Sequence, residues 1–264
     1  MFANLRNLIR YRGLIQSLVA RELKARYRGS VLGFFWSFVN PLLVLLVYSF
    51  VFTFVMPNKS EGLQPYALFM FCGILPWTWF SASLSEAAGS LISGGNLIKK
   101  VLFPAEVLPM VAVLANMVNF LLGLLILIPG LIYYHRLQMT PALLWFPVTV
   151  LVQLVFSAGL ALVLASLTVH FRDIRDLLAN ILMLWFFATP IIYSWRQENV
   201  QRFKTLFDLN PFTHLAVSYQ EILFFPGPVG HWKWLVALGV LSIGVFLAGY
   251  WFFDRLRDSF AEAV

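Results

Sequence analysis

Residues 107–135 read VLPMVAVLANMVNFLLGLLILIPGLIYYH, and no Asp, Glu, Lys or Arg interrupts them. About 20 apolar residues in helical form are enough to cross the hydrocarbon core of a bilayer. The helix is required because lipid offers no partner to unpaired backbone N–H and C=O groups. This stretch alone therefore predicts a membrane-spanning helix.

Five further stretches lack charged residues over a similar length, and together they predict an all-α polytopic membrane protein. The composition agrees, because 60% of the 264 residues are hydrophobic and 12% are charged, whereas an ordinary soluble domain has about 25% charged residues. The six predicted transmembrane helices cover residues 31–56, 64–87, 106–131, 142–169, 177–195 and 233–253.

The distribution of Lys and Arg predicts the orientation, because loops rich in these residues stay in the cytoplasm. Six spans put both termini on one side. Of the 19 Lys and Arg, the N-terminal segment carries seven, and two more lie in each of the second-to-third-span loop, the fourth-to-fifth-span loop and the C-terminal tail. Thirteen of these residues therefore lie on the side of the termini and six on the other side, which predicts that both termini are cytoplasmic. The net charge of +7 is thus a topology signal and gives no reason to expect nucleic acid as a partner.

Two segments outside the spans have patterns of their own. Residues 1–29 combine basic residues with apolar ones at helical spacing, which predicts an amphipathic interface helix on the cytoplasmic face, in contact with membrane lipid. A short soluble helix packed on the membrane domain is the alternative. Residues 196–231 contain apolar runs too short to span, punctuated by Pro and Gly. They predict external re-entrant helices before the last span, with a folded external cap as the alternative.

The cytoplasmic loop 92–104 is short and amphipathic. Its apolar residues flank Lys99 and Lys100, and Pro104 ends it before the third span. We interpret the loop as a small docking helix for a cytoplasmic partner. The alternative is a connecting turn with an ordinary pair of positive charges.

The chain lacks the residue patterns of several kinds of active site. The predicted spans have essentially no ionisable residue in their interior, which disfavours a carrier driven by protons or sodium. The four histidines have no second ligand at metal spacing, and neither a nucleophile elbow nor a G-x-x-x-x-G-K-[ST] phosphate loop occurs. We therefore expect no catalytic, metal-binding or cofactor-binding residue here. The energy for any transport must come from another chain.

Four sets of residues, spread in order over nearly the whole chain, resemble one family. They are R-E-L-K-x-R-Y-x-x-S-x-L-G-x-x-W-x-x-x-x-P at 21–41, N-L-I-K-K-V-x-F-P at 96–104, F-R-D-I at 171–174 with T-P-I-I-Y at 189–193, and L-N-P-F at 209–212. The chain is similar to the permease subunits of ABC-2 type polysaccharide exporters, which move O-antigen, capsule or teichoic acid. The resemblance identifies residues 30–264 as the ABC-2 type transmembrane domain.

The resemblance implies partners and a cargo. It implies a homodimer that recruits two copies of a separate cytoplasmic ATPase subunit, which binds ATP and Mg²⁺. It implies a channel for undecaprenyl-diphosphate-linked polysaccharide, such as O-antigen, across the bacterial cytoplasmic (inner) membrane. Teichoic acid, capsule or another amphipathic cargo is the alternative within the same kind of permease. An intramembrane transferase and a passive channel are alternatives from other classes.

Two groups of residues become site candidates under this resemblance. Aromatic rings stack on sugars without a fixed register, so a sliding polymer suits the channel-lining candidates Phe34, Phe35, Trp36, Tyr48, Trp77, Trp79, Trp185, Phe186 and Tyr193. For each of them taken singly, helix packing or lipid contact is the alternative. Trp77, Trp79 and Trp185 stand out because they lie too deep for an interfacial aromatic belt. The candidates for coupling to the ATPase are Arg21, Glu22, Lys24, Arg26, Asn96, Leu97, Lys99, Lys100, Phe103, Arg172 and Asp173.

Overall fold

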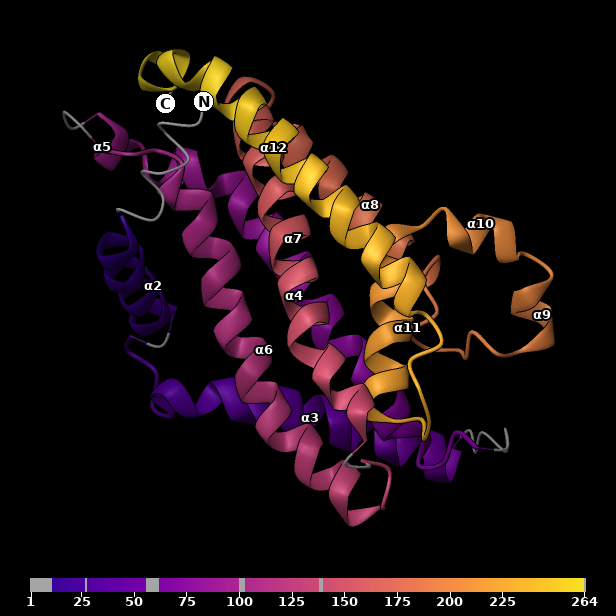
Figure 1. Ribbon diagram of the computed structural model, residues 1–264. Helices are drawn as coiled ribbons and strands as arrows, with labels where there is room; N and C mark the ends of the chain where they lie inside the picture. Colours follow the sequence, from indigo (N-terminus) through magenta and orange to yellow (C-terminus); the bar gives the residue numbers. More distant parts are fainter. Residues whose placement is uncertain (1–10, 27, 56–61, 100–102, 138–139, 264) are drawn as a thin grey trace.

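The computed structural model describes residues 11–26, 28–55, 62–99, 103–137 and 140–263. Within these ranges every regular element is a helix (Figure 1). Five helical segments are long and apolar enough to cross a membrane. They are α3 (Trp36–Phe50) with the π-helix η2 (Val51–Val55), α4 (Tyr66–Ser93), α6 (Val107–Tyr133), the 3-10 helix η3 (Pro141–Leu144) with α7 (Trp145–His170), and α12 (Trp232–Ala263).

These five segments confirm the spans predicted over 31–56, 64–87, 106–131, 142–169 and 233–253 as apolar helices of spanning length. The sixth prediction needs correction. Instead of a continuous helix over 177–195, the structure has α8 (Ile174–Phe187), which is 14 residues long. At 1.5 Å per residue such a helix measures about 21 Å, less than the roughly 30 Å of a hydrocarbon core.

Pro190 is the reason why α8 ends early. Proline has no N–H for the helical ladder, and it disfavours helical geometry at the residue before it. The helix accordingly stops at Phe187, and residues 188–197 form turns. An apolar composition could not reveal this break, because residues 188–195 are nearly as apolar as the helix.

The chain between α7 and α12 connects the two ends of the bundle in short pieces. At one end, His170 in the last turn of α7 lies 3.1 Å from Ser259 near the end of α12. At the other end, the rings of Trp145 and Trp232, which begin α7 and α12, are 6.4 Å apart. The pieces between are α8, α9 (Glu198–Gln201), α10 (Lys204–Asp208) and α11 (Pro211–Leu223).

Helix α11 is short but lies inside the protein. All twelve of its residues after Pro211 are buried, and it packs on α4, α7 and α12. Asn210 caps its N-terminus by accepting a hydrogen bond from the backbone N–H of Phe212 at 3.0 Å, and Pro211 occupies the first helical position. The region 196–231 thus contains the short helices that its sequence predicts.

The core of the bundle is formed by α4, α6, α7 and α12, with α4 packed between α6 and α7 (Figure 1). Helices α7 and α12 approach most closely at two glycines. A Cβ atom on Gly249 would lie 2.4 Å from the backbone oxygen of Gly159, so side chains at these positions would separate the helices. Glycine therefore sets the spacing of this pair.

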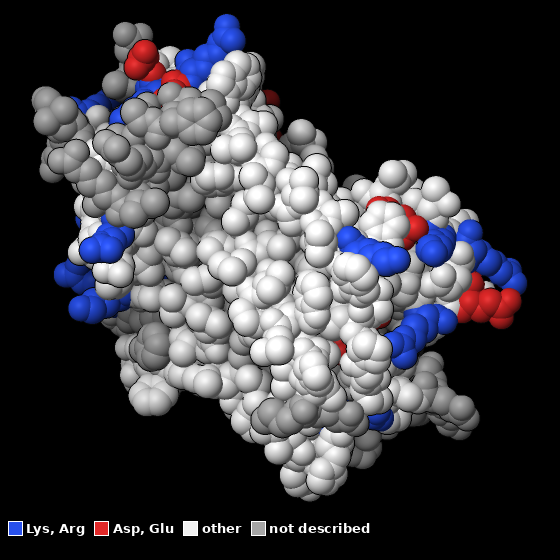
Figure 2. Space-filling view, in the orientation of Figure 1, with Lys and Arg blue, Asp and Glu red and all other residues white. Residues whose placement is uncertain are grey.

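Helix α2 (Arg12–Arg26) packs on α6, where Leu18 contacts Val107 and Val111. It provides the helix predicted within 1–29, of which residues 1–10 lie outside the described residues. Helix α3 crosses α6 at a steep angle (Figure 1). None of the apolar side chains of α3 is buried. Figure 2 shows charged residues gathered around α2, the C-terminal end of α12, α9 and α10, with a broad uncharged face between them.

Candidate functional site

A cavity of about 650 Å³ opens between α2, α4, α6 and α8. Serine and glycine from α4 form one wall, and the charged residues in its lining are Arg21, Glu22, Glu86, Arg175 and Asp176. It lies beside α5 (Gly95–Ile98), the helix within the predicted coupling loop, since Leu97 also contributes to its lining.

A second cavity, of about 360 Å³, continues along α4 and α8. It shares Ser85 and Ala179 with the first and adds Trp77 and Ser81 from α4 and Phe186 from α8. On α4, residues 77, 81 and 85 line the second cavity and residues 85, 89 and 93 line the first, and the members of each set, four positions apart, are neighbours on the helix surface. The two cavities together form one groove, here called the α4–α8 groove, that is charged at one end and aromatic at the other.

The aromatic end of the groove is part of a tight ring cluster. The ring of Trp77 lies 4.9 Å from Phe212, 5.8 Å from Phe186 and 6.3 Å from Trp185. Trp185 belongs to this ring cluster but is not a lining residue of either cavity. Its Nε1–H donates to Oδ1 of Asn210 at 2.7 Å. Hydroxyl groups and ring faces along one groove are the groups that contact both the polar and the C–H surfaces of a sugar.

Trp79 occupies a different place from the other two deep tryptophans. It is 1% exposed, stacks on Phe120 at 5.1 Å and donates its Nε1–H to the backbone oxygen of Val113 at 3.1 Å. Its ring therefore faces α6, away from the α4–α8 groove. With Trp36 it borders a separate cavity of about 220 Å³ between α3, α4 and α6.

The other aromatic candidates are spread over the molecule. Phe35 is exposed, and Tyr48 stacks on Phe52 at 6.2 Å. The hydroxyl of Tyr193 donates to the backbone oxygen of Phe187 at 2.8 Å. The side chain of Phe34 lies outside the described part of the chain. The structure thus gathers Trp77, Trp185 and Phe186, places Trp36 and Trp79 together at the separate cavity, and leaves Phe35, Tyr48 and Tyr193 apart from both groups.

Asn210 is a junction residue that the sequence interpretation did not single out as part of a site. Besides capping α11 and accepting from Trp185, it donates from Nδ2 to the oxygen of Ala188 and to Oγ1 of Thr189, both at 3.0 Å. It thus ties the end of α8 to the start of α11. The pair Asn210-Pro211 was the available signal, because Asn followed by Pro is typical of a helix start.

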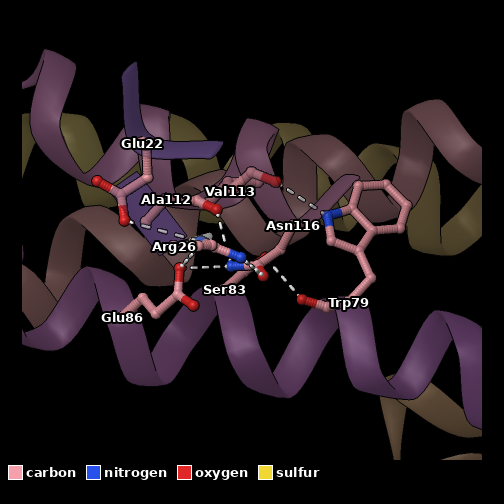
Figure 3. Close-up of polar contacts among 8 residues, drawn as sticks. All are labelled: Glu22, Arg26, Trp79, Ser83, Glu86, Ala112, Val113 and Asn116. Atoms are coloured by element: carbon pink, nitrogen blue, oxygen red, sulfur yellow. Dashed lines mark hydrogen bonds and ion pairs between the residues drawn. The ribbon is translucent and has the colours of Figure 1, made fainter. Parts of the chain in front are cut away.

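The predicted coupling residues divide into an exposed set and an internal one. The exposed residues belong to α2, α5 and the turn between α7 and α8; they are Arg21, Glu22, Lys24, Asn96, Lys99, Arg172 and Asp173. Leu97 lines the groove and Phe103 packs beside Leu18, while Lys100 lies outside the described residues. Arg26 turns inward to Glu86 and Asn116 (Figure 3).

The comparison with known proteins gives the class first. A model of the ABC-2 type transporter family matches residues 13–224, and the chain belongs to this family. It is therefore a multi-pass membrane protein and the permease subunit of an ABC transporter, a transport component that is not itself an ATPase. This confirms the resemblance found in its sequence motifs.

The individual relatives narrow the class to polysaccharide export permeases. The O-antigen export system permease protein RfbA of Myxococcus xanthus is 43% identical over all of both chains. RfbA of Klebsiella pneumoniae is 30% identical over 94% of each chain. The capsule polysaccharide export inner-membrane protein CtrC of Neisseria meningitidis serogroup B is 27% identical over 61% of this chain and 60% of its own. The chain is thus a full-length homologue of O-antigen export permeases.

Proposed function

We propose that this chain is the membrane subunit of an exporter that moves undecaprenyl-diphosphate-linked polysaccharide, with O-antigen as its cargo, across the bacterial inner membrane. Two copies of the chain form the path, and two copies of a cytoplasmic ATPase subunit drive it. ATP and Mg²⁺ bind to that partner. Capsule polysaccharide is the weaker alternative, because the capsule relative CtrC is aligned over less of the chain at lower identity.

The observation that carries the proposal is the identity of 43% with an O-antigen permease over the whole chain. The α4–α8 groove supports it physically. A hydrated polymer needs a continuous polar or aromatic path through lipid, and this groove offers serine hydroxyls, two aromatic rings and a charged opening. A second copy of the chain would close the open side of the groove into a channel.

The proposed orientation has both termini in the cytoplasm. In this orientation α5 and the end of α12 face the cytoplasm, α8 to α11 provide the sixth crossing in pieces, and α11 is a re-entrant helix. The burial of α11 supports this, because a turning backbone is tolerated at membrane depth only inside protein. Loop 92–104 and α2 then lie on the side where an ATPase would dock.

A complementation experiment tests the function. The gene for this chain is deleted in its own host and returned on a plasmid, and surface O-antigen is measured by immunoblot and by labelling of intact cells. We expect the deletion to abolish surface O-antigen and to leave undecaprenyl-linked glycan inside the cell. The plasmid should restore export.

Two controls make the result specific. Restoration should fail when the ATPase subunit carries an inactivating substitution in its own phosphate loop. Capsule should be measured in the same cells. Loss of capsule with normal O-antigen would contradict the proposed cargo, and normal export of both glycans would contradict the proposed class of cargo.

A further inference from the structure

Arg26, at the end of α2, points its guanidinium between α4 and α6 (Figure 3). Its Nη1 donates to Oδ1 of Asn116 at 3.0 Å, and its Nη2 donates to Oε2 of Glu86 at 2.5 Å. Its Nε lies 3.7 Å from Oε1 of Glu22, one helical turn earlier. The side chain of Arg26 is 19% exposed, so most of it is withdrawn from solvent.

Asn116 closes the arrangement from a third helix. It is 4% exposed, and its Nδ2 donates to Oε2 of Glu86 at 2.7 Å and to the backbone oxygen of Ala112 at 3.0 Å. Arg26, Glu86 and Asn116, here called the Arg26 network, thus join α2, α4 and α6. Because an unpaired charge among apolar helices is costly, each member depends on the others.

Glu86 belongs to the α4–α8 groove as well as to this network. The charged side chains lining the groove are the cations Arg21 and Arg175 and the carboxylates Glu22, Glu86 and Asp176. Arg26 forms an ion pair with Glu86. When Arg26 is included, three cations balance three carboxylates. Without Arg26 the carboxylates outnumber the cations, and Glu86 leaves an uncompensated negative charge at the opening.

We infer that Arg26 is a positioning residue of the cargo path, which neutralises Glu86 where the α4–α8 groove opens so that an anionic head group can pass. The inference rests on the proposed function, since the diphosphate of the lipid-linked glycan supplies the negative charge. Like charges repel strongly where protein and lipid lower the effective dielectric constant. The Arg26 network would then serve the passage of the head group as well as the position of α2.

The first set of variants distinguishes neutralisation of Glu86 by Arg26 from a role of Arg26 in holding α2 in place. Arg26→Gln removes the cation and should lower export per inserted molecule by roughly tenfold, the size expected when a charged partner is left unpaired. Arg26→Gln combined with Glu86→Gln removes both charges. Its export should return to the level of Glu86→Gln alone. If the double variant stays as low as Arg26→Gln, or if Arg26→Gln exports like wild type, the inference is wrong.

The second set of variants leaves the Arg26 network intact, so it remains informative if Arg26→Gln fails to fold. Ser85 is exposed, directly precedes Glu86 on α4 and lines both parts of the groove. Ser85→Asp adds a carboxylate to the groove, and Ser85→Asn adds an uncharged side chain of nearly the same size. Export per inserted molecule should be roughly tenfold lower for Asp than for Asn. Equal export by the two variants would overturn the inference.

Complementation with the wild-type chain distinguishes failure of the proposed function from failure of the inference about Arg26. All variants are tested by plasmid complementation in the deletion host, with membrane-inserted protein measured by immunoblot. If the wild-type chain does not restore O-antigen export, the proposed function fails. If it does restore export while Asp and Asn at position 85 behave alike, only the role of Arg26 and groove charge fails.

Discussion

Trp77 lies where the aromatic ring cluster meets the α4–α8 groove, and this position allows a prediction for a single side chain. Trp77→Ala should lower export per inserted molecule by roughly threefold to tenfold, because the stacking face is lost. Trp77→Phe keeps a ring face and should lose less. The measurement is surface O-antigen divided by the amount of inserted protein.

Trp79→Ala is the matched control for that prediction. Trp79 is as deeply placed on the same helix, but its ring packs on Phe120 away from the groove. Removing a buried ring of this size costs about 3–5 kcal/mol, so protein level and export should fall together. If Trp77→Ala also lowered both in proportion, Trp77 would be a packing residue only.

At the scale of elements, the close approach of α7 and α12 predicts a stability effect. Gly249→Ala places a methyl group 2.4 Å from the backbone oxygen of Gly159, so the helices must separate. Overpacking of this kind costs about 1–3 kcal/mol. Thermal unfolding of the purified protein in detergent should therefore shift to lower temperature.

Gly244→Ala provides the control on the same helix, because a Cβ atom there meets nothing within 4 Å. It should unfold at the temperature of the wild type or slightly above, since alanine favours the helix over glycine. Equal destabilisation by the two substitutions would show that the Gly159–Gly249 approach does not limit the packing of α7 and α12.

The elements also show what sequence patterns could and could not predict. Charge-free stretches of about 20 residues locate five spanning helices, because length and hydropathy are the requirements that a bilayer imposes. The same criterion overextended α8, because apolar composition continues past Pro190 while the helical ladder does not. The short helices of region 196–231 were predictable from interrupted apolar runs, although the complete burial of α11 was not.

The candidate site was predictable only in part, because some of its residues lie far apart along the chain and meet only in the folded structure. Depth within a span singled out Trp77, Trp79 and Trp185. The structure brings the rings of Trp77 and Trp185 within 6.3 Å of each other, whereas the ring of Trp79 packs against α6. Ser81 and Ser85 carry no signal of their own, since a serine in an apolar helix is uninformative until its face is known. Arg26 and Glu86 are 60 positions apart, and their contact exists only because α2 packs on α6 beside α4.

At the scale of the whole molecule, export of a polymer requires one continuous path. The groove begins among the charged side chains near α2 and α5 and ends at the rings of Trp77 and Phe186. The two-copy assembly, the inner-membrane location and the cytoplasmic termini are proposals that share this path as their common element. A glycan caught during export should therefore touch the groove and no lipid-facing helix surface.

Photocrosslinking during export tests this claim most directly. A photoreactive amino acid is placed at Ser85 in the groove or at Leu151, which is 58% exposed on α7, in cells whose ATPase subunit is active so that cargo enters the path. After irradiation the purified chain is probed for attached O-antigen. We expect a glycan-bearing adduct at Ser85 and none at Leu151. An adduct at Leu151 without one at Ser85 would contradict this expectation.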